Sequence, residues 1–223
     1  MAQRLCQPGK EINVARPREF DEASVLDAAI QCFWVKGFEA TSMRDLIDCM
    51  GITGASLYNA FGDKRALYRK ALEHYLQNGL GERVARLEGS LAPRQAIEGF
   101  FGEIIERSIT DPQQRGCLMV NSALEAAPHN PDAQAVVDEF LAQAQAFFLR
   151  CLKAGQDNGT ISRFQTCEDL ASLMLNTLLG LRVLARAKPQ RALLESVVRP
   201  VLALLDVQLA PASPSSLVME SQR

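Results

Sequence analysis

Apolar residues recur at helical spacing along most of the chain. From Val25 they fall at positions 25, 28, 29, 32 and 33, the stripe of a helix that buries one side. Asp21 stands before the stripe as a candidate N-cap, and Gly37 ends it. No segment shows the alternating, β-branched pattern typical of strands. The pattern therefore predicts an all-α protein of about nine helices.

Short polar residues and glycines mark the ends of the next helices. Ser42 and Asp45 have the spacing of a capping box. The predicted starts and stops are Ser42 and Gly51, Thr53 and Gly62, then Asp63 with an end near Gly79 or beyond. Longer helices are expected at 93 to 109, 116 to 127, 131 to 157, 166 to 187 and 190 to 207.

This change from short to long helices predicts two domains. The first covers residues 16 to 76 and the second residues 77 to 208. The flanking segments 1 to 15 and 209 to 223 are expected to be flexible, because they carry little apolar periodicity.

Composition narrows the class of protein. The 223 residues are 48% apolar and 22% charged, which is typical of a folded, soluble protein. The N-terminus lacks the apolar core of a signal peptide, and no uninterrupted apolar run reaches the roughly 18 residues of a membrane span, so we expect a cytoplasmic protein without a membrane partner. The six cysteines form no C-x-x-C pair and have two histidines as companions, so we expect no metal site and no cofactor. Cys32 and Cys49 fall at apolar positions and are predicted to be small buried residues.

The net charge of −2 gives little support to nucleic-acid binding by itself. Residues 1 to 70 carry ten Lys and Arg against nine Asp and Glu, so the N-terminal third is only slightly basic. Contact with a phosphate backbone depends on where basic groups lie, which the net sum does not show.

The stretch from Gly51 to Gly62 has the features of a DNA-reading helix. Leu57, Ala60, Phe61 and Thr53 share its inward face, and Ala55, Tyr58 and Asn59 lie on the opposite side. The helix follows a short helix after a tight turn containing glycine, which is the helix-turn-helix arrangement. Small residues allow close approach to the groove, hydroxyls suit phosphate oxygens, and an asparagine can pair with adenine. The alternative is a short surface helix in an ordinary bundle.

The segment from residue 25 to residue 72 resembles the N-terminal domain of the TetR family of bacterial transcriptional repressors. The matching residues are Ala28-Ala29, Phe33, Lys36-Gly37-Phe38, Thr41-Ser42, Gly51-Ile52-Thr53, Leu57-Tyr58, Phe61, Lys64 and Leu67. The resemblance implies a homodimer whose third helices enter successive major grooves of a palindromic operator. It also implies a helical C-terminal domain that binds an inducer and releases the DNA. Ile47, Met50, Asn59 and Ala60 depart from the common family pattern, so the operator sequence is not carried over.

The expected contacts with double-stranded DNA combine both arguments. They are Arg18, Thr41, Ser42, Arg44, Thr53, Gly54, Ala55, Ser56, Tyr58, Asn59 and Lys64. Tyr58 and Lys64 are predicted to act mainly on phosphates, and Asn59 on a base edge.

The last two predicted helices are apolar over a wider arc than one packed face needs. We expect them to form a four-helix bundle between two subunits. The predicted interface residues are Leu178, Leu181, Leu194, Val197, Val198 and Val201.

A ligand cavity is expected among the aromatic residues of the second domain. The predicted lining or sensor residues are Phe101, Ile105, Cys117, Asn121, Phe147 and Met174, for a small apolar or electrophilic inducer. The alternative is that these residues simply fill the core. The stretch Arg115-Gly116-Cys117 is similar to one in the TetR subgroup of electrophile and oxidant sensors represented by the N-ethylmaleimide repressor. A helix start and the charge of Arg115 would favour a reactive thiolate there, unless Cys117 is a buried structural residue.

The sequence thus favours a DNA-binding transcriptional regulator, a repressor released by a small-molecule, electrophile or oxidant signal. Two alternatives are an all-helical enzyme and an architectural DNA-binding protein without an inducer. The chain carries no glycine-rich phosphate loop, no metal-ligand spacing and no histidine paired with a plausible nucleophile, so we expect no enzyme.

Overall fold

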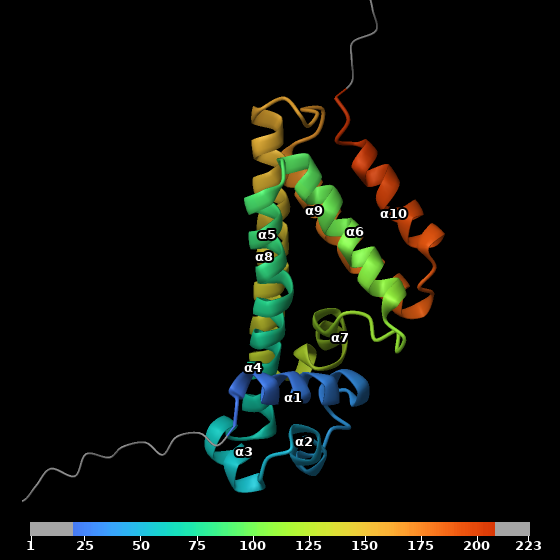
Figure 1. The fold of residues 1–223 in the computed structure, drawn as a ribbon. Coiled ribbons are helices and arrows are strands. Elements are labelled where there is room, and N and C mark those ends of the chain that lie inside the picture. The colour runs from blue at the N-terminus through green and yellow to red at the C-terminus, as the bar shows by residue number, and fades with distance from the viewer. Residues whose placement is uncertain (1–19, 208–223) are drawn as a thin grey trace, which may run out of the picture.

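The computed structural model describes residues 20 to 207, and every regular element within that range is a helix (Figure 1). The helices are α1 (Glu22–Lys36), α2 (Met43–Met50), α3 (Gly54–Phe61), α4 (Lys64–Leu76), α5 (Glu82–Ser90), α6 (Pro93–Thr110), α7 (Leu118–Glu125), α8 (Pro131–Asp157), α9 (Cys167–Ala187) and α10 (Arg191–Ala203). A π-helical turn at Gln77–Gly81 joins α4 to α5, so the two form one continuous rod and the all-α prediction is confirmed. The segments predicted to be flexible lie outside the described residues.

The predicted helix starts are confirmed by side-chain caps. The backbone N–H of the third helical residue is bound by the cap side chain in α1, α2, α3 and α4, where the caps are Asp21, Ser42, Thr53 and Asp63. Asp45 completes the capping box of α2 by accepting from the Ser42 backbone N–H at 2.8 Å. Gly51 ends α2 with φ 64°, a left-handed conformation that glycine adopts without a steric penalty.

Helices α1, α2 and α3 form a small layer at one end of the molecule (Figure 1). α1 packs against α2 and α4, and α3 packs against both α2 and α4. The core of this layer contains Phe33, whose ring centre lies 4.7 Å from that of Tyr68. The N-terminal part of α4, which contacts both α1 and α3, therefore belongs to the same packed unit.

The other helices build the larger body. The α4–α5 rod runs beside α8, α6 and α9 run at an angle to it, and α10 packs on α6 and α9 away from the rod (Figure 1). Four fully buried phenylalanines from α6 and α8 fill the centre, namely Phe100, Phe101, Phe147 and Phe148. The predicted helix from 190 to 207 ends earlier, at Ala203, and the one from 116 to 127 is divided into α7 and a 3-10 turn at Ala127–His129.

Helix α9 is long and apolar enough to cross a membrane by length and composition alone. In the fold it packs against α8, α10 and α6 instead, and its inward residues Leu178 and Leu181 are buried. Core helices of globular proteins often pass the same test, because burial requires the same apolar composition.

Candidate DNA-binding surface and effector cavity

The recognition-helix prediction agrees with the geometry of α3. Leu57 and Phe61 are buried against the layer, whereas Tyr58 is 55% exposed and Ala55 and Asn59 are exposed beside it. The outward face of α3 therefore presents a small methyl, a phenol and a carboxamide. These groups suit close approach to a major groove, with the carboxamide able to reach a base edge.

Two other residues of α3 serve its local structure. The Thr53 side chain accepts a hydrogen bond from the Ser56 backbone N–H at 3.1 Å, and its hydroxyl bonds the Ser56 hydroxyl at 2.9 Å. A Cβ added at Gly54 would lie 3.3 Å from the Ile47 side chain, closer than most real contacts. Glycine at this position thus lets α3 approach α2. It also leaves the first residue of α3 without a side chain.

Thr41 is not placed to contact DNA. It is 1% exposed, and its hydroxyl donates to the Gly37 carbonyl at 2.6 Å, which closes the loop between α1 and α2. The prediction that Thr41 lies on the contact surface is wrong, because burial removes it from any partner outside the chain. Ser42 and Arg44, one and three residues further along, are exposed.

Lys64 is also engaged within the protein. Its ammonium donates to the carbonyls of Phe38, Glu39 and Thr41 at 2.9, 3.3 and 3.1 Å. It also lies 4.4 Å from the centre of the Phe38 ring. The three N–H donors of the ammonium are therefore satisfied, and the side chain ties α4 to the loop before α2.

The remaining basic side chains of this surface have different surroundings. Arg44 on α2 and Arg65 on the first turn of α4 are exposed. Lys36 is paired with Asp45 at 2.5 Å, and this hydrogen bond holds the pKa of Asp45 well below its usual range. Arg18, predicted as a contact, lies outside the described residues.

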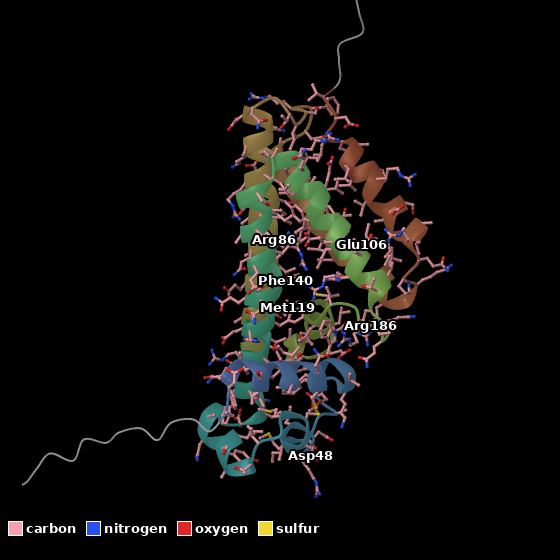
Figure 2. All side chains as sticks on the ribbon, viewed as in Figure 1. Asp48, Arg86, Glu106, Met119, Phe140 and Arg186 are labelled. Atoms are coloured by element: carbon pink, nitrogen blue, oxygen red, sulfur yellow. The ribbon has the colours of Figure 1, made fainter. Side chains whose placement is uncertain are left out.

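An inner cavity of about 30 Å³ lies between the α4–α5 rod, α6, α7, α8 and α9. Met119 of α7 and Phe140 of α8, both labelled in Figure 2, line it together. The other lining residues are Tyr75, Leu76, Gly79, Leu80, Arg83, Phe100, Ile104, Arg107, Cys117, Leu178 and Arg182. The cavity has an apolar wall and a group of arginines, which the sequence analysis did not foresee.

The predicted lining residues have different outcomes. Cys117 lines the inner cavity, as expected. Phe101 and Ile105 face a separate groove between α6 and α10, and Asn121 lines a small cavity beside α1. Phe147 and Met174 line none of these cavities and are fully buried in the packed core, so the prediction was wrong for them.

An outer cavity of about 240 Å³ adjoins the inner one and shares Tyr75, Arg107 and Arg182 with it. It opens beside the loop at residues 111 to 117, and Trp34 of α1 forms part of its wall. The Trp34 and Tyr75 rings meet edge to face, with centres 5.1 Å apart. The two cavities therefore extend from the body of the molecule to the layer of α1, α2 and α3, which carries the candidate DNA-binding surface.

Cys117 precedes the first residue of α7 and is buried. The Tyr75 hydroxyl donates a hydrogen bond to its sulfur at 3.9 Å, and burial raises the pKa of Tyr75. Arg115 is engaged elsewhere, because it pairs with Asp111 at 3.2 Å. The positive charges beside Cys117 in the inner cavity come from Arg107 and Arg182 instead.

The other described cysteines differ in burial. Burial, reinforced by the neighbouring Cys49 thiol, raises the pKa of Cys32 to about 12. Burial also raises the pKa of Cys151, to about 11, and that of Cys167. These three thiols are therefore protonated near neutral pH. Cys49 is exposed on α2, which corrects the prediction that it would be buried.

The predicted dimer residues lie mainly inside the protomer. Leu178, Leu181, Leu194, Val198 and Val201 are all buried, and Val197 alone of the six is partly exposed. The outward face of α9 instead presents Leu173, Asn176, Gly180 and Val183, which follow helical spacing. Val183 is 50% exposed. Five of the six predicted residues are therefore used in the packing of the protomer itself, and the exposed apolar residues of α9 lie on its other face.

A short helix, a glycine turn and an exposed second helix, joined to a helical body with an internal cavity, define a helix-turn-helix DNA-binding regulator. Two family descriptions match the chain: bacterial regulatory proteins of the tetR family at residues 25–71, and the tetracyclin repressor-like C-terminal domain at residues 93–201. The chain belongs to the TetR family of transcriptional regulators.

Individual relatives cover most of the chain. The uncharacterized HTH-type transcriptional regulator YezE of Bacillus subtilis (strain 168) is 31% identical over 86% of this chain and 100% of its own length. The HTH-type transcriptional repressor ComR of Escherichia coli (strain K12) is 28% identical over 77% of this chain and 82% of its own length. A cysteine mutant of the TetR family regulator CifR, solved with a 26-base-pair operator, is 32% identical with a TM-score of 0.75, covering 86% and 100% of the two chains. These relatives are regulators, which favours that function over the enzyme alternative.

Proposed function

We propose that the protein is a cytoplasmic transcriptional repressor that binds a palindromic operator as a homodimer and is released by a small-molecule, electrophile or oxidant signal. The outward face of α3 is the observation that supports DNA binding. Ala55, Tyr58 and Asn59 are exposed together there, on a helix that Leu57 and Phe61 anchor to the core. The operator complex of the related CifR supports the same role.

The contacts expected with DNA follow from exposure. Asn59 reads a base edge, while Tyr58, Arg44 and Ser42 bind phosphate oxygens. The Thr53 hydroxyl caps α3 and donates to the Ser56 hydroxyl, so these two hydroxyls contribute less to DNA binding than the free groups. Lys64 positions the loop before α2 rather than meeting DNA, because its ammonium donates to three carbonyls.

The dimer forms through the outward faces of α9 and α10. Leu173 and Val183 on α9, and Leu204 after α10, are large apolar residues that remain exposed in the protomer. Gly180, with open space around its Cα, lies between the two α9 residues and allows close approach of a partner helix. A second copy covering this face would produce the intermolecular four-helix bundle that the apolar content of these helices predicts.

The cavities are where the signal acts. A ligand or a modified Cys117 would add volume where the α4–α5 rod, α6 and α7 meet, and a close-packed interior responds by shifting helices as units. α4 continues directly into the DNA-binding layer and bonds α7 through Tyr68 and Ser122, whose hydroxyl oxygens are 2.7 Å apart. The shift would change the separation of the two α3 helices, which must match one helical turn of DNA.

The test is a titration of the purified protein into DNA from its own promoter region, followed by footprinting. We expect saturable protection of one palindromic site by two protomers, with DNA of unrelated sequence failing to compete. Salt-dependent binding without a preferred site would contradict the proposal and would indicate an architectural DNA-binding protein.

A further inference from the structure

Two arginines at the junction of the cavities have no acidic partner among residues 20 to 207. Arg182 is only 9% exposed, and its one hydrogen bond within the described part of the chain is to the Ser108 hydroxyl at 3.5 Å. Arg107 lines both cavities with it. The nearby carboxylates are engaged elsewhere, since Glu103 binds Arg83 and Arg86, and Asp111 binds Arg115. A buried cation without a counter-ion is costly, so this position favours a bound anion.

Across the lining of both cavities, arginines outnumber carboxylates. Four arginines, Arg83, Arg107, Arg115 and Arg182, and one carboxylate, Asp111, line the two joined cavities. Burial, followed by the charges of Arg107 and Arg182, lowers the pKa of Arg83, which is consistent with mutual repulsion among the three cations. The Tyr75 hydroxyl lies at the same junction and is a hydrogen-bond donor.

The wall facing these cations is apolar. Phe100, Ile104, Phe140, Met119 and Leu178 line the inner cavity. An inorganic anion would leave this wall without a partner, whereas an organic carboxylate would use both parts of the lining.

We propose that the junction of the two cavities binds a small organic carboxylate. The carboxylate accepts hydrogen bonds from Arg107 and Arg182, and from Tyr75 when its hydroxyl turns from the Cys117 sulfur to the ligand, and its apolar body extends into the inner cavity towards Phe140. The ligand is the effector of the repressor, so this inference rests on the proposed function.

The size of the cavity explains how binding would act on the fold. In this structure the inner cavity of about 30 Å³ has room for about two water molecules, so an apolar body must displace α6 or α7 from the α4–α5 rod. Met119 can adapt to part of the change, because its side chain is unbranched and flexible. The remaining displacement acts on α4, which leads to the DNA-binding layer.

The chain provides its own probe for this binding. Trp34 is the single tryptophan of the sequence and lines the outer cavity, so its fluorescence reports occupancy there. Acetate, hexanoate, decanoate and benzoate would be titrated into the full chain, beside the uncharged hexanamide and benzamide, with calorimetry as a second readout. We expect hexanoate or benzoate to bind about tenfold to a hundredfold more tightly than its amide, since hydrogen bonds to charged groups carry the difference.

Three variants locate the site. Arg182→Gln should lose about tenfold or more in carboxylate affinity and Arg182→Lys should recover part of it, while Arg163→Gln, exposed and in the loop before α9, is the control that should bind as wild type. Arg107 is exposed, so the Arg107→Gln variant should fold normally, and it should also bind the carboxylate more weakly.

Equal affinity for acid and amide, unchanged binding by both Arg182→Gln and Arg107→Gln, or no binding by any of the carboxylates would overturn the inference. Operator binding without ligand is measured separately on the same preparations. Its absence would remove the proposed repressor function, and the charge-selective fluorescence change would still report the carboxylate site.

Discussion

The indole nitrogen of Trp34 donates a hydrogen bond to the backbone carbonyl of Arg115 at 3.2 Å, and the Arg115 guanidinium lies 4.6 Å from the centre of the indole. Trp34 belongs to α1 of the DNA-binding layer, and Arg115 lies in the loop that leads to Cys117 and α7. The Arg115 carbonyl also accepts from the Asn121 side chain at 3.1 Å. This loop therefore connects the two cavities to α1 by direct polar contacts, in addition to the connection through α4.

Trp34→Phe tests this connection, because it keeps an aromatic ring and removes the N–H donor. We expect a loss of about 0.5 to 1.5 kcal/mol in the free energy of unfolding, the usual net value of one hydrogen bond. Hydrogen exchange should become faster at residues 111 to 117 and remain unchanged at the centre of α8. Unchanged exchange in the loop would show that Trp34 does not hold it.

Arg44→Ala and Lys64→Ala separate a phosphate contact from a structural one. Arg44→Ala should weaken binding to all DNA sequences and lower the slope of log affinity against log salt by about one. Lys64→Ala should leave that slope nearly unchanged and lower the free energy of unfolding by roughly 1 to 3 kcal/mol, since three carbonyls lose their donor. Binding isotherms at several salt concentrations and urea unfolding distinguish the two. The reverse pattern would return Lys64 to the DNA contacts.

Val183→Asp and Val198→Asp place the same charge on opposite sides of the α9 and α10 pair. Val183 is 50% exposed, so its substitution should leave the protomer folded but monomeric, with tight operator binding lost. Val198 is 3% exposed, so its substitution should destabilise the protomer by roughly 3 to 5 kcal/mol. Light scattering gives the oligomeric state and circular dichroism the fold. A stable dimer of Val183→Asp would place the interface elsewhere.

The sequence predicted where the helices begin and end better than it predicted which helices pack against one another. The caps at Ser42, Thr53 and Asp63 are local hydrogen bonds, so three or four residues suffice to recognise them. The burial of Val198 and the exposure of Val183 depend on which helices surround α9 and α10. A helix that is apolar on most sides gives no periodic signal for this choice.

The candidate site shows the same limit. Tyr58 and Asn59 are exposed as predicted, because the short α3 has one clearly apolar face. Lys64 of α4 contacts the loop that contains Thr41 across sequence separations of 23 to 26 residues, and local spacing does not show such contacts. In the sequence, Arg107 and Arg182 look like ordinary arginines on the solvated face of a helix. Only the packing of α6 against α9 shows that they line the same cavity.

Cys117→Ser tests the electrophile or oxidant signal. The comparison is made in a Cys49→Ser background, because the exposed Cys49 on α2 would itself react beside the DNA surface. N-ethylmaleimide or hypochlorite should release the Cys49→Ser protein from its operator, and the additional Cys117→Ser substitution should prevent release. Cys167→Ser is the matched control and should not change the response, since burial raises the pKa of that thiol. Equal release with and without Cys117, or no release of either protein, would exclude the sensor role.

The central claim is that the outward face of α3 reads the operator, and Asn59→Ala tests it most directly. The affinities of wild type and Asn59→Ala are measured for the operator and for each single-base variant of one half-site. We predict that the substitution costs roughly 1 to 3 kcal/mol on the operator and removes the preference at one base pair, while discrimination at the other positions is retained. An equal loss on every sequence, or no loss at all, would contradict base reading by α3.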